Sequence, residues 1–277
     1  MQMKILPLPE NWDATNETLH LYSRVIGVVA RLHAPTQPHW WHVSLRLDGD
    51  GYLSQAMPLP GGGAFRLRMD LGSHEVELLT GGTRQHAWPM DAGLSATQLA
   101  ANVFAAVADY GLTGDYPLEK YADDQPRRYN PAHAAAWFAA ISAIDSLLET
   151  RRSSLTGERG PVQLWPHGFD IAFEWFGKTL SFPDERGHPV NYPAQISLGF
   201  SPGERYHPAP YFYSNPYPFD DQRLKKHTLV HGARWFNNGW QGSVLEYDSV
   251  AGDPAGAEKF LEYAQTLFDL ASPDLRI

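Results

Sequence analysis

The stretch 65–71 reads FRLRMDL, and its apolar residues alternate strictly with charged ones. Successive side chains of a β-strand point to opposite faces, so this pattern predicts a strand that is buried on one face only. Two glycine-containing turns follow, Gly72-Ser73 and Gly81-Gly82, and they lead into further apolar segments at 74–79 and 84–90. Such short turns between strands predict an antiparallel meander.

Helices are predicted on both sides of this meander. Apolar residues at helical spacing predict a helix from about Asp13, with Asn11 or Asp13 as its N-cap, to about His33. After the meander, Ser95 and Gln98 have the spacing of a capping box, which predicts the start of a second helix. Between the first helix and the meander, residues 41–47 (WHVSLRL) alternate and predict another strand, with a hairpin turn after it.

The second half of the chain repeats this order. Asn130-Pro131 predicts a helix N-terminus, and Asp253-Pro254 predicts the N-terminus of the last helix. Between them, residues 162–176 predict a strand that ends at a turn, Gly177-Lys178, and the Pro- and aromatic-rich segment 181–221 predicts a packed loop. Further strands are predicted at 195–200, 210–214 and 243–247.

The predicted fold class is therefore α+β, organised as a tandem pseudo-repeat. Each half, 1–115 and 130–277, is expected to be an antiparallel β-meander flanked by an N-terminal and a C-terminal helix, with the insertion at about 181–221 in the second half. The polar segment between them is predicted to be a linker.

Composition excludes several classes of function. The chain has 277 residues, a net charge of −9 and no cysteine, so disulfides, thiolate catalysis and sulfur-ligated metal sites are excluded. Without a clustered basic surface, neither nucleic acid nor an anionic membrane is an expected partner. The N-terminal residues do not resemble a signal peptide, so a cytoplasmic location is expected. No particular cofactor or oligomeric state is indicated.

Two segments combine tryptophan with histidine. Residues 38–42 read PHWWH and residues 164–170 read LWPHGFD, and the pseudo-repeat places them at matching strand openings. A histidine titrates near neutral pH and can transfer protons, and the Asp170 carboxylate could orient the His167 imidazole or cap the backbone of a bulge. His42 is expected on the strand face opposite a buried Trp41.

Aromatic and acidic residues complete the candidate site. The candidate catalytic residues are His42, His167 and Asp170. The candidate ligand-binding residues are His39, Trp40, Trp41, Trp165, Tyr211, Tyr213 and Glu246. Tyr211 and Tyr213 would lie on one face of a strand, where they could line a pocket or pack the two halves together. Glu246 is placed near the His167 segment. Arg46, Arg66 and Arg68 lie on the polar faces of strands and are expected either to bind an anion or to be solvated.

These motifs resemble a bacterial family of unknown function. The resemblance is carried by the Trp-Trp-His segment at 40–42, by 164–170, by the segment GFSPG at 199–203 and by PYFY at 210–213. It covers nearly the whole chain and implies a shared fold, but no activity. The family often has a second histidine where this chain has Gly168, which weakens the case for a paired-histidine site.

Three functions remain open from the sequence. The first is binding, with acid/base catalysis in addition, of a small polar or aromatic molecule in a cleft between the halves. The second is a metal-dependent hydrolase that uses His39, His42, His167 and a carboxylate, Asp170 or Glu246. The third is a non-catalytic interaction protein, in which the aromatic residues only hold the halves together.

Overall fold

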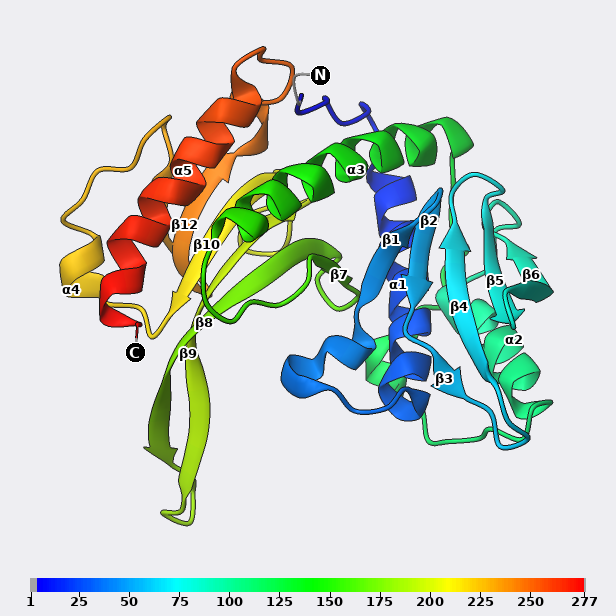
Figure 1. The fold of residues 1–277 in the computed structure, drawn as a ribbon. Helices are drawn as coiled ribbons and strands as arrows, with labels where there is room; N and C mark the ends of the chain where they lie inside the picture. Colours follow the sequence, from blue (N-terminus) through cyan, green and yellow to red (C-terminus); the bar gives the residue numbers. More distant parts are fainter. Residues whose placement is uncertain (1–3, 277) are drawn as a thin grey trace. The chain divides into compact units, whose positions relative to one another are not determined.

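The computed structural model describes residues 4–276 and has an α+β fold (Figure 1). The chain forms two compact units. The first, called here the N-terminal unit, contains residues 8–142 and 163–169. The C-terminal unit contains residues 4–7, 143–162 and 170–276. Residues 1–3 and 277 of the predicted halves lie outside the described residues, and the tandem repeat stays a prediction.

The N-terminal unit is an antiparallel sheet with helices. Its elements are α1 (Asp13–His33), β1 (Leu45–Asp48), β2 (Gly51–Ser54), β3 (Met57–Pro58), β4 (Ala64–Asp70), β5 (Glu75–Thr80), β6 (Thr83–Pro89), α2 (Ala96–Ala108), the first half of α3 (Pro131–Ser154) and β7 (Gln163–Trp165), with 3-10 turns at Pro38–Val43 and Leu118–Lys120. The strand order is β7-β1-β2-β4-β5-β6, and β3 also pairs with β4.

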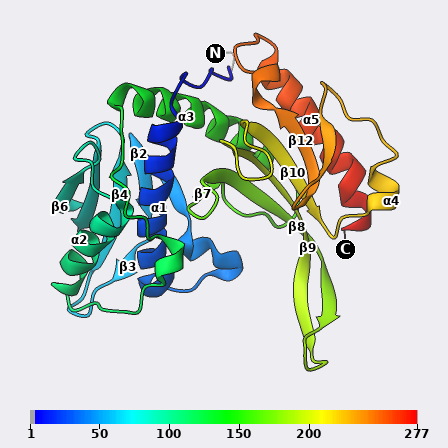
Figure 2. The ribbon, with the colours of Figure 1, turned by 180° about the vertical axis from the view of Figure 1, so that it is seen from behind.

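Within residues 4–276, helices cover one face of this sheet. Both α1 and α2 lie on the same side of the meander (Figures 1 and 2). The alternation predicted for β4 is confirmed, because Phe65, Leu67 and Met69 are fully buried while Arg66 is exposed on the opposite face. The capping box of α2 is also confirmed. The Ser95 hydroxyl accepts from the Gln98 amide at 3.0 Å, and the Gln98 side chain accepts from the Ser95 amide at 2.9 Å.

The predicted strand at 41–47 is wrong in its first half. Residues Pro38–Val43 form a kinked pair of 3-10 turns, because His39 and Trp40 both adopt left-handed backbone angles (φ 54° and 62°). These angles reverse the chain direction, so the strand begins only at Leu45. The predicted side-chain orientation is reversed as well, since His42 is buried and Trp41 is half-buried. The side-chain cap expected for α1 is also not formed.

The C-terminal unit contains the remaining strands of the sheet. Its elements are the second half of α3, β8 (Asp170–Pro183), β9 (Pro189–Ser201), β10 (Tyr211–Tyr217), α4 (Asp221–Leu224), β11 (Arg234–Asn237), β12 (Gln241–Glu246) and α5 (Gly256–Ala271), with 3-10 turns at Tyr247–Ser249 and Ser272–Asp274. The strand order is β8-β9-β10-β12-β11, and every pair is antiparallel.

Helix α5 packs on one face of this sheet (Figure 1). The ring of Phe260 in α5 lies 4.4 Å from that of Phe212 in β10, and the Tyr263 hydroxyl lies 3.0 Å from the Ser243 hydroxyl of β12. The strands predicted at 195–200, 210–214 and 243–247 are confirmed within β9, β10 and β12. Tyr213, which neighbours Phe212 in β10, points to the sheet face opposite α5.

The predicted turn at Gly177-Lys178 is wrong, because β8 continues through it to Pro183. The register with β9 shifts at this point, and the Lys178 amide donates instead to the carbonyl of Leu275 at 2.7 Å. A Cβ on Gly177 would lie 1.9 Å from the same carbonyl oxygen. Much of the predicted loop 181–221 is therefore strand, and β8 and β9 form a long hairpin that extends beyond α5 in both views (Figures 1 and 2).

The second half of α3 carries a carboxyl group that titrates unusually. Burial, together with the charge of Glu149, raises the pKa of Asp145 to about 6. Since this pKa is above that of an unfolded Asp, the folded state holds the proton between about pH 4 and 6, and stability is lost as the pH rises through that window. We expect Asp145→Asn to raise the melting temperature at pH 7 and to have little effect at pH 4.

Melting curves followed by circular dichroism from pH 4 to pH 8 would measure this effect. Asp109→Asn is the matched control, since it removes an exposed carboxylate at the end of α2, and its effect on the melting temperature should be small. An equal shift at pH 4 and pH 7 for Asp145→Asn would contradict the prediction.

Within residues 4–276, no helix is both long enough and apolar enough to cross a membrane.

Candidate functional site

The two Trp/His segments lie side by side in the N-terminal unit. Leu45 of β1 pairs with Leu164 of β7, and the Ser44 hydroxyl donates to the Gln163 side chain at 2.6 Å. Helix α1 approaches both segments at Gly27, where a Cβ would lie 2.9 Å from the ring of Pro166. Pairing between β1 and β7 therefore brings together residues that are more than 100 positions apart.

The surroundings of His42 favour a structural role over proton transfer. Its side chain is buried, its Nδ1 accepts from the Gln37 amide at 3.3 Å, and its ring stacks on Trp40 at 5.4 Å. Burial, with a smaller effect from Arg31, lowers the pKa of His42, so the neutral imidazole predominates at pH 7. The Arg31 guanidinium lies over the Trp40 ring, 4.5 Å from its centre. The Trp40 side chain is 55% exposed.

His167 lies in a tight turn with an exposed side chain. The amides of Gly168 and Phe169 both donate to the carbonyl of Trp165, and Phe169 has φ 57°. The Trp165 ring meets the His167 ring edge-on at 6.0 Å. The carbonyl of His167 lies 3.1 Å from Nε2 of His20 in α1, whose pKa is lowered by burial. The predicted bend at this point is confirmed, and His20 holds it in place.

In the C-terminal unit, Asp170 and Tyr213 form a short hydrogen bond. The Tyr213 hydroxyl donates to Asp170 Oδ2 at 2.5 Å. The Tyr213 ring lies over the backbone of Gly199, its cross-strand partner, where a Cβ would be 2.8 Å from Tyr213 Cζ. Burial, with the charges of Asp170 and Glu174, raises the pKa of Tyr213 well above its usual value. Tyr213 is therefore a hydrogen-bond donor in a region of negative potential.

Aromatic rings continue from Tyr213 across the same sheet face. Tyr211 lies 6.1 Å from Tyr213 and 6.1 Å from Trp240, with which it is stacked. Trp240 also packs on Phe236 at 4.5 Å. His207 stacks on Tyr211 at 4.6 Å and closes the far side of the group. The prediction that Tyr211 and Tyr213 share a strand face is confirmed by their places in β10.

Carboxylates lie around these rings. Glu204 accepts from the Trp240 indole at 3.3 Å and from the Tyr206 amide at 2.8 Å, and both donors are neutral. Glu246 is different, because it pairs with Arg234 at 2.8 Å and its other oxygen lies 3.1 Å from His207 Nε2. The charge of Glu246 is therefore compensated by a neighbouring cation.

We call one group of residues on this face the Tyr213 cluster. Its members are Asp170, Glu174, Glu204, Tyr211, Tyr213 and Trp240. Sequence reasoning missed Glu174, Glu204 and Trp240, because each belongs to a different segment from Tyr213. Only the pairing of β8, β9, β10 and β12 brings these segments together. The alternation in 169–175, which puts Asp170 and Glu174 on one strand face, was the one available signal.

The candidate residues are divided between the two units. The N-terminal unit contains His39, Trp40, Trp41, His42, Trp165 and His167, whereas the C-terminal unit contains Asp170, Tyr211, Tyr213 and Glu246. Within residues 4–276, no group of three or more His, Asp or Glu side chains is arranged to hold a metal ion.

Comparisons with known proteins give a family but no activity. No curated protein and no solved structure matches the chain. A family model described as a family of unknown function (DUF5996) matches residues 5–275, which is nearly the whole sequence and includes all the motifs named above. The chain therefore belongs to this family of unknown function, DUF5996.

Proposed function

We propose that the protein binds a small organic cation at the Tyr213 cluster. The ligand would carry an amine or ammonium group, and an apolar or aromatic portion would rest on the rings. The observation that carries the proposal is the hydrogen bond of 2.5 Å between Tyr213 and Asp170, inside a group of aromatic rings with further carboxylates around it.

Two physical effects favour a cation at this place. The faces of Tyr and Trp rings carry negative charge density, which attracts ammonium groups within about 6 Å of a ring centre. The carboxylates of Asp170 and Glu204 accept hydrogen bonds from Tyr213 and Trp240, which orient both carboxylates beside the rings. A cation would lower the electrostatic energy of both groups, and an anion would raise it.

Asp170 has the central role in this proposal. The Tyr213 hydroxyl fixes the orientation of its carboxylate, and the absence of a side chain at Gly199 leaves room for the Tyr213 ring. The carboxylate would then accept a hydrogen bond from the ammonium group, and the neighbouring rings would contact the apolar part of the ligand.

Titration calorimetry with three probes of similar shape tests this proposal: 2-phenylethylammonium, neutral 2-phenylethanol and anionic phenylacetate. We expect saturable binding of the cation, and binding of the other two at least about tenfold weaker, because only the cation is attracted by the carboxylates and by the faces of the rings. Asp170→Asn should weaken binding of the cation by a similar factor, since it removes the charge but keeps an acceptor for Tyr213.

The matched control is Glu258→Gln, which removes an exposed carboxylate of α5 and should leave affinity for the cation unchanged. Equal affinity for all three probes would overturn the proposal, as would equal effects of Asp170→Asn and Glu258→Gln.

Two earlier expectations are kept as parts of the proposal. A cytoplasmic location stays a prediction. Proton transfer by His42 and His167 stays a prediction. Of the two, exposed His167 is better placed for it than buried His42.

A further inference from the structure

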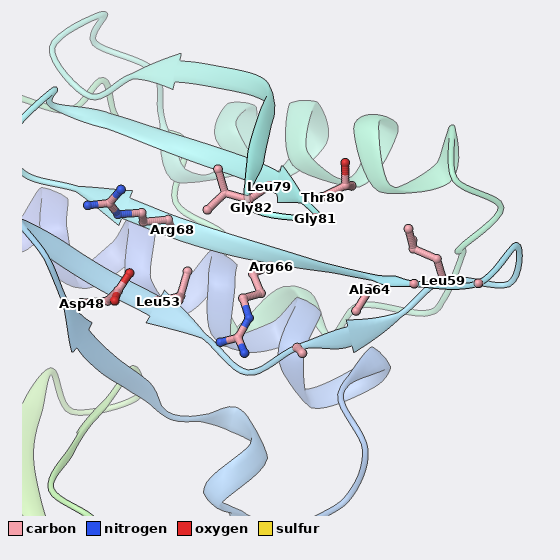
Figure 3. Close-up of a pocket in the computed structure, with 13 residues that line it drawn as sticks. Asp48, Leu53, Leu59, Ala64, Arg66, Arg68, Leu79, Thr80, Gly81 and Gly82 are labelled. Atoms are coloured by element: carbon pink, nitrogen blue, oxygen red, sulfur yellow. The ribbon is translucent and has the colours of Figure 1, made fainter.

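A second candidate site lies in the N-terminal unit, on the sheet face opposite α1 and α2. A cavity of about 740 Å³ opens there, which is within the range of roughly 300–1,000 Å³ usual for small-molecule pockets. Figure 3 shows its position between β2, β4 and the turns that join β3 to β4 and β5 to β6. The side chains of Leu53, Leu59 and Leu79 make part of its lining apolar.

The two turns leave the mouth of this cavity open. The first contains Gly62 and Gly63 and the second contains Gly81 and Gly82, all with φ between 55° and 96°. Residues that carry a side chain rarely adopt these backbone angles, so the turns require glycine. A Cβ at any of the four would have no atom within 4 Å, which means that no neighbouring side chain fills the space at the rim.

Arg66 provides a cationic group without a counter-ion. It lies in the middle of β4, its side chain is exposed, and its Nη1 donates to the Ser54 carbonyl at 3.1 Å. In residues 4–276 it forms no ion pair with an acidic side chain. Its remaining N–H groups are therefore free to bind a ligand. By contrast, Arg68 pairs with Asp70 at 3.1 Å and lies beside Glu77 in the sheet, so most of its charge is already compensated.

The carboxylate of Asp48 restricts which ligand groups can bind at the other end of the cavity. Figure 3 shows Asp48 at the end away from Leu59, with Leu53 between Asp48 and Arg66. A negative group would be attracted at Arg66 and repelled at Asp48. The lining thus favours a ligand with one anionic end and an apolar body over a ligand with two anionic ends.

We propose that this cavity binds an organic monoanion, with its carboxylate on Arg66 and its apolar portion over Leu53 and Leu79. An arginine side chain can donate two parallel hydrogen bonds to a carboxylate, which orients the ligand as well as attracting it. The proposal is independent of the Tyr213 cluster, which lies in the other unit and is expected to bind the opposite charge.

Titration calorimetry of the full chain with octanoate tests the proposal, with neutral octanol, octylammonium and the dianion octanedioate as comparison probes. We expect octanoate to bind saturably and at least about tenfold more tightly than each comparison probe. Arg66→Gln should weaken octanoate binding at least about tenfold, whereas Arg66→Lys should keep most of the affinity because it keeps the charge. Asp48→Asn should strengthen the binding of octanedioate.

Arg186→Gln is the matched control, since Arg186 is an exposed arginine of the C-terminal unit, in the turn between β8 and β9, and does not line the cavity. It should leave octanoate affinity within about twofold of the original. Circular dichroism melting curves would check that each variant is folded. The proposal is overturned if octanoate does not bind, if octanol binds equally well, or if Arg66→Gln and Arg186→Gln have the same effect.

Discussion

Trp137→Ala is expected to reduce the free energy of unfolding by about 3–5 kcal/mol, as for other large-to-small aromatic substitutions in a core. The indole of Trp137 is fully buried, between Trp12 at 4.8 Å and Phe169 at 5.5 Å. Its Nε1 donates to the Tyr52 hydroxyl at 2.9 Å. Alanine would leave a cavity inside a stack of rings and remove the donor to a buried phenol.

Urea denaturation followed by far-ultraviolet circular dichroism measures this loss. Trp40→Ala is the matched control, because Trp40 is 55% exposed and its removal leaves no cavity, so a loss below about 1 kcal/mol is expected. Tyr52→Phe should cost less than Trp137→Ala, since it removes one hydroxyl and keeps the packing. A loss for Trp137→Ala no larger than that for Trp40→Ala would show that the ring stack does not stabilise the N-terminal unit.

Gly199→Val is the second substitution with a large expected effect. Gly199 lies in β9 between its cross-strand partners Ala172 and Tyr213. A Cβ there would lie 2.6 Å from the Ile171 carbonyl oxygen, 2.7 Å from Ala172 Cβ and 2.8 Å from Tyr213 Cζ. Two of these atoms cannot move without moving a strand, so a loss of about 3 kcal/mol or more is expected from overpacking.

The same substitution should also affect the proposed binding of a cation. The side chain of valine would push the Tyr213 ring away from the sheet, so Tyr213 could no longer orient Asp170. At a temperature where the variant is still folded, 2-phenylethylammonium should therefore bind at least about tenfold more weakly. Gly61→Val is the control for both measurements, because a Cβ at Gly61 has no atom within 4 Å. If Gly199→Val and Gly61→Val have the same free energy of unfolding, the expectation that a side chain at Gly199 clashes with the neighbouring strands is wrong.

Among the strands that sequence analysis found, the clearest signal came from β4, which has one buried and one solvated face. In β4 the alternation is complete, so its buried residues follow from period alone, and its pairing with β5 follows from the short turn between them. Strands without this pattern were missed. β3 has only two residues, and the outer part of the hairpin of β8 and β9, from about 178 to 192, is mostly exposed, so its residues show no core-facing period.

The two wrong predictions, a strand at 41–43 and a turn at Gly177-Lys178, have a common cause. His39 and Trp40 adopt left-handed backbone angles that neither residue favours by itself, and the stacking of Trp40 with Arg31 and His42 accompanies this conformation. Gly177-Lys178 has the composition of a turn, but the carbonyl of Leu275 binds the Lys178 amide and the strand continues. In both places contacts from distant residues outweigh local propensity.

The amino-acid sequence by itself determined the α+β class, most of the helices, the central strands and the segments that carry the Trp/His and Tyr motifs. Each of these depends on interactions between residues close together in the chain, such as periodic burial or a helix cap. The tertiary structure alone decided that Tyr213 meets Asp170 and Trp240, and that Arg66 faces an open cavity. These arrangements depend on which strands pair and in which register, and that is set by the packing of the whole sheet rather than by any single segment.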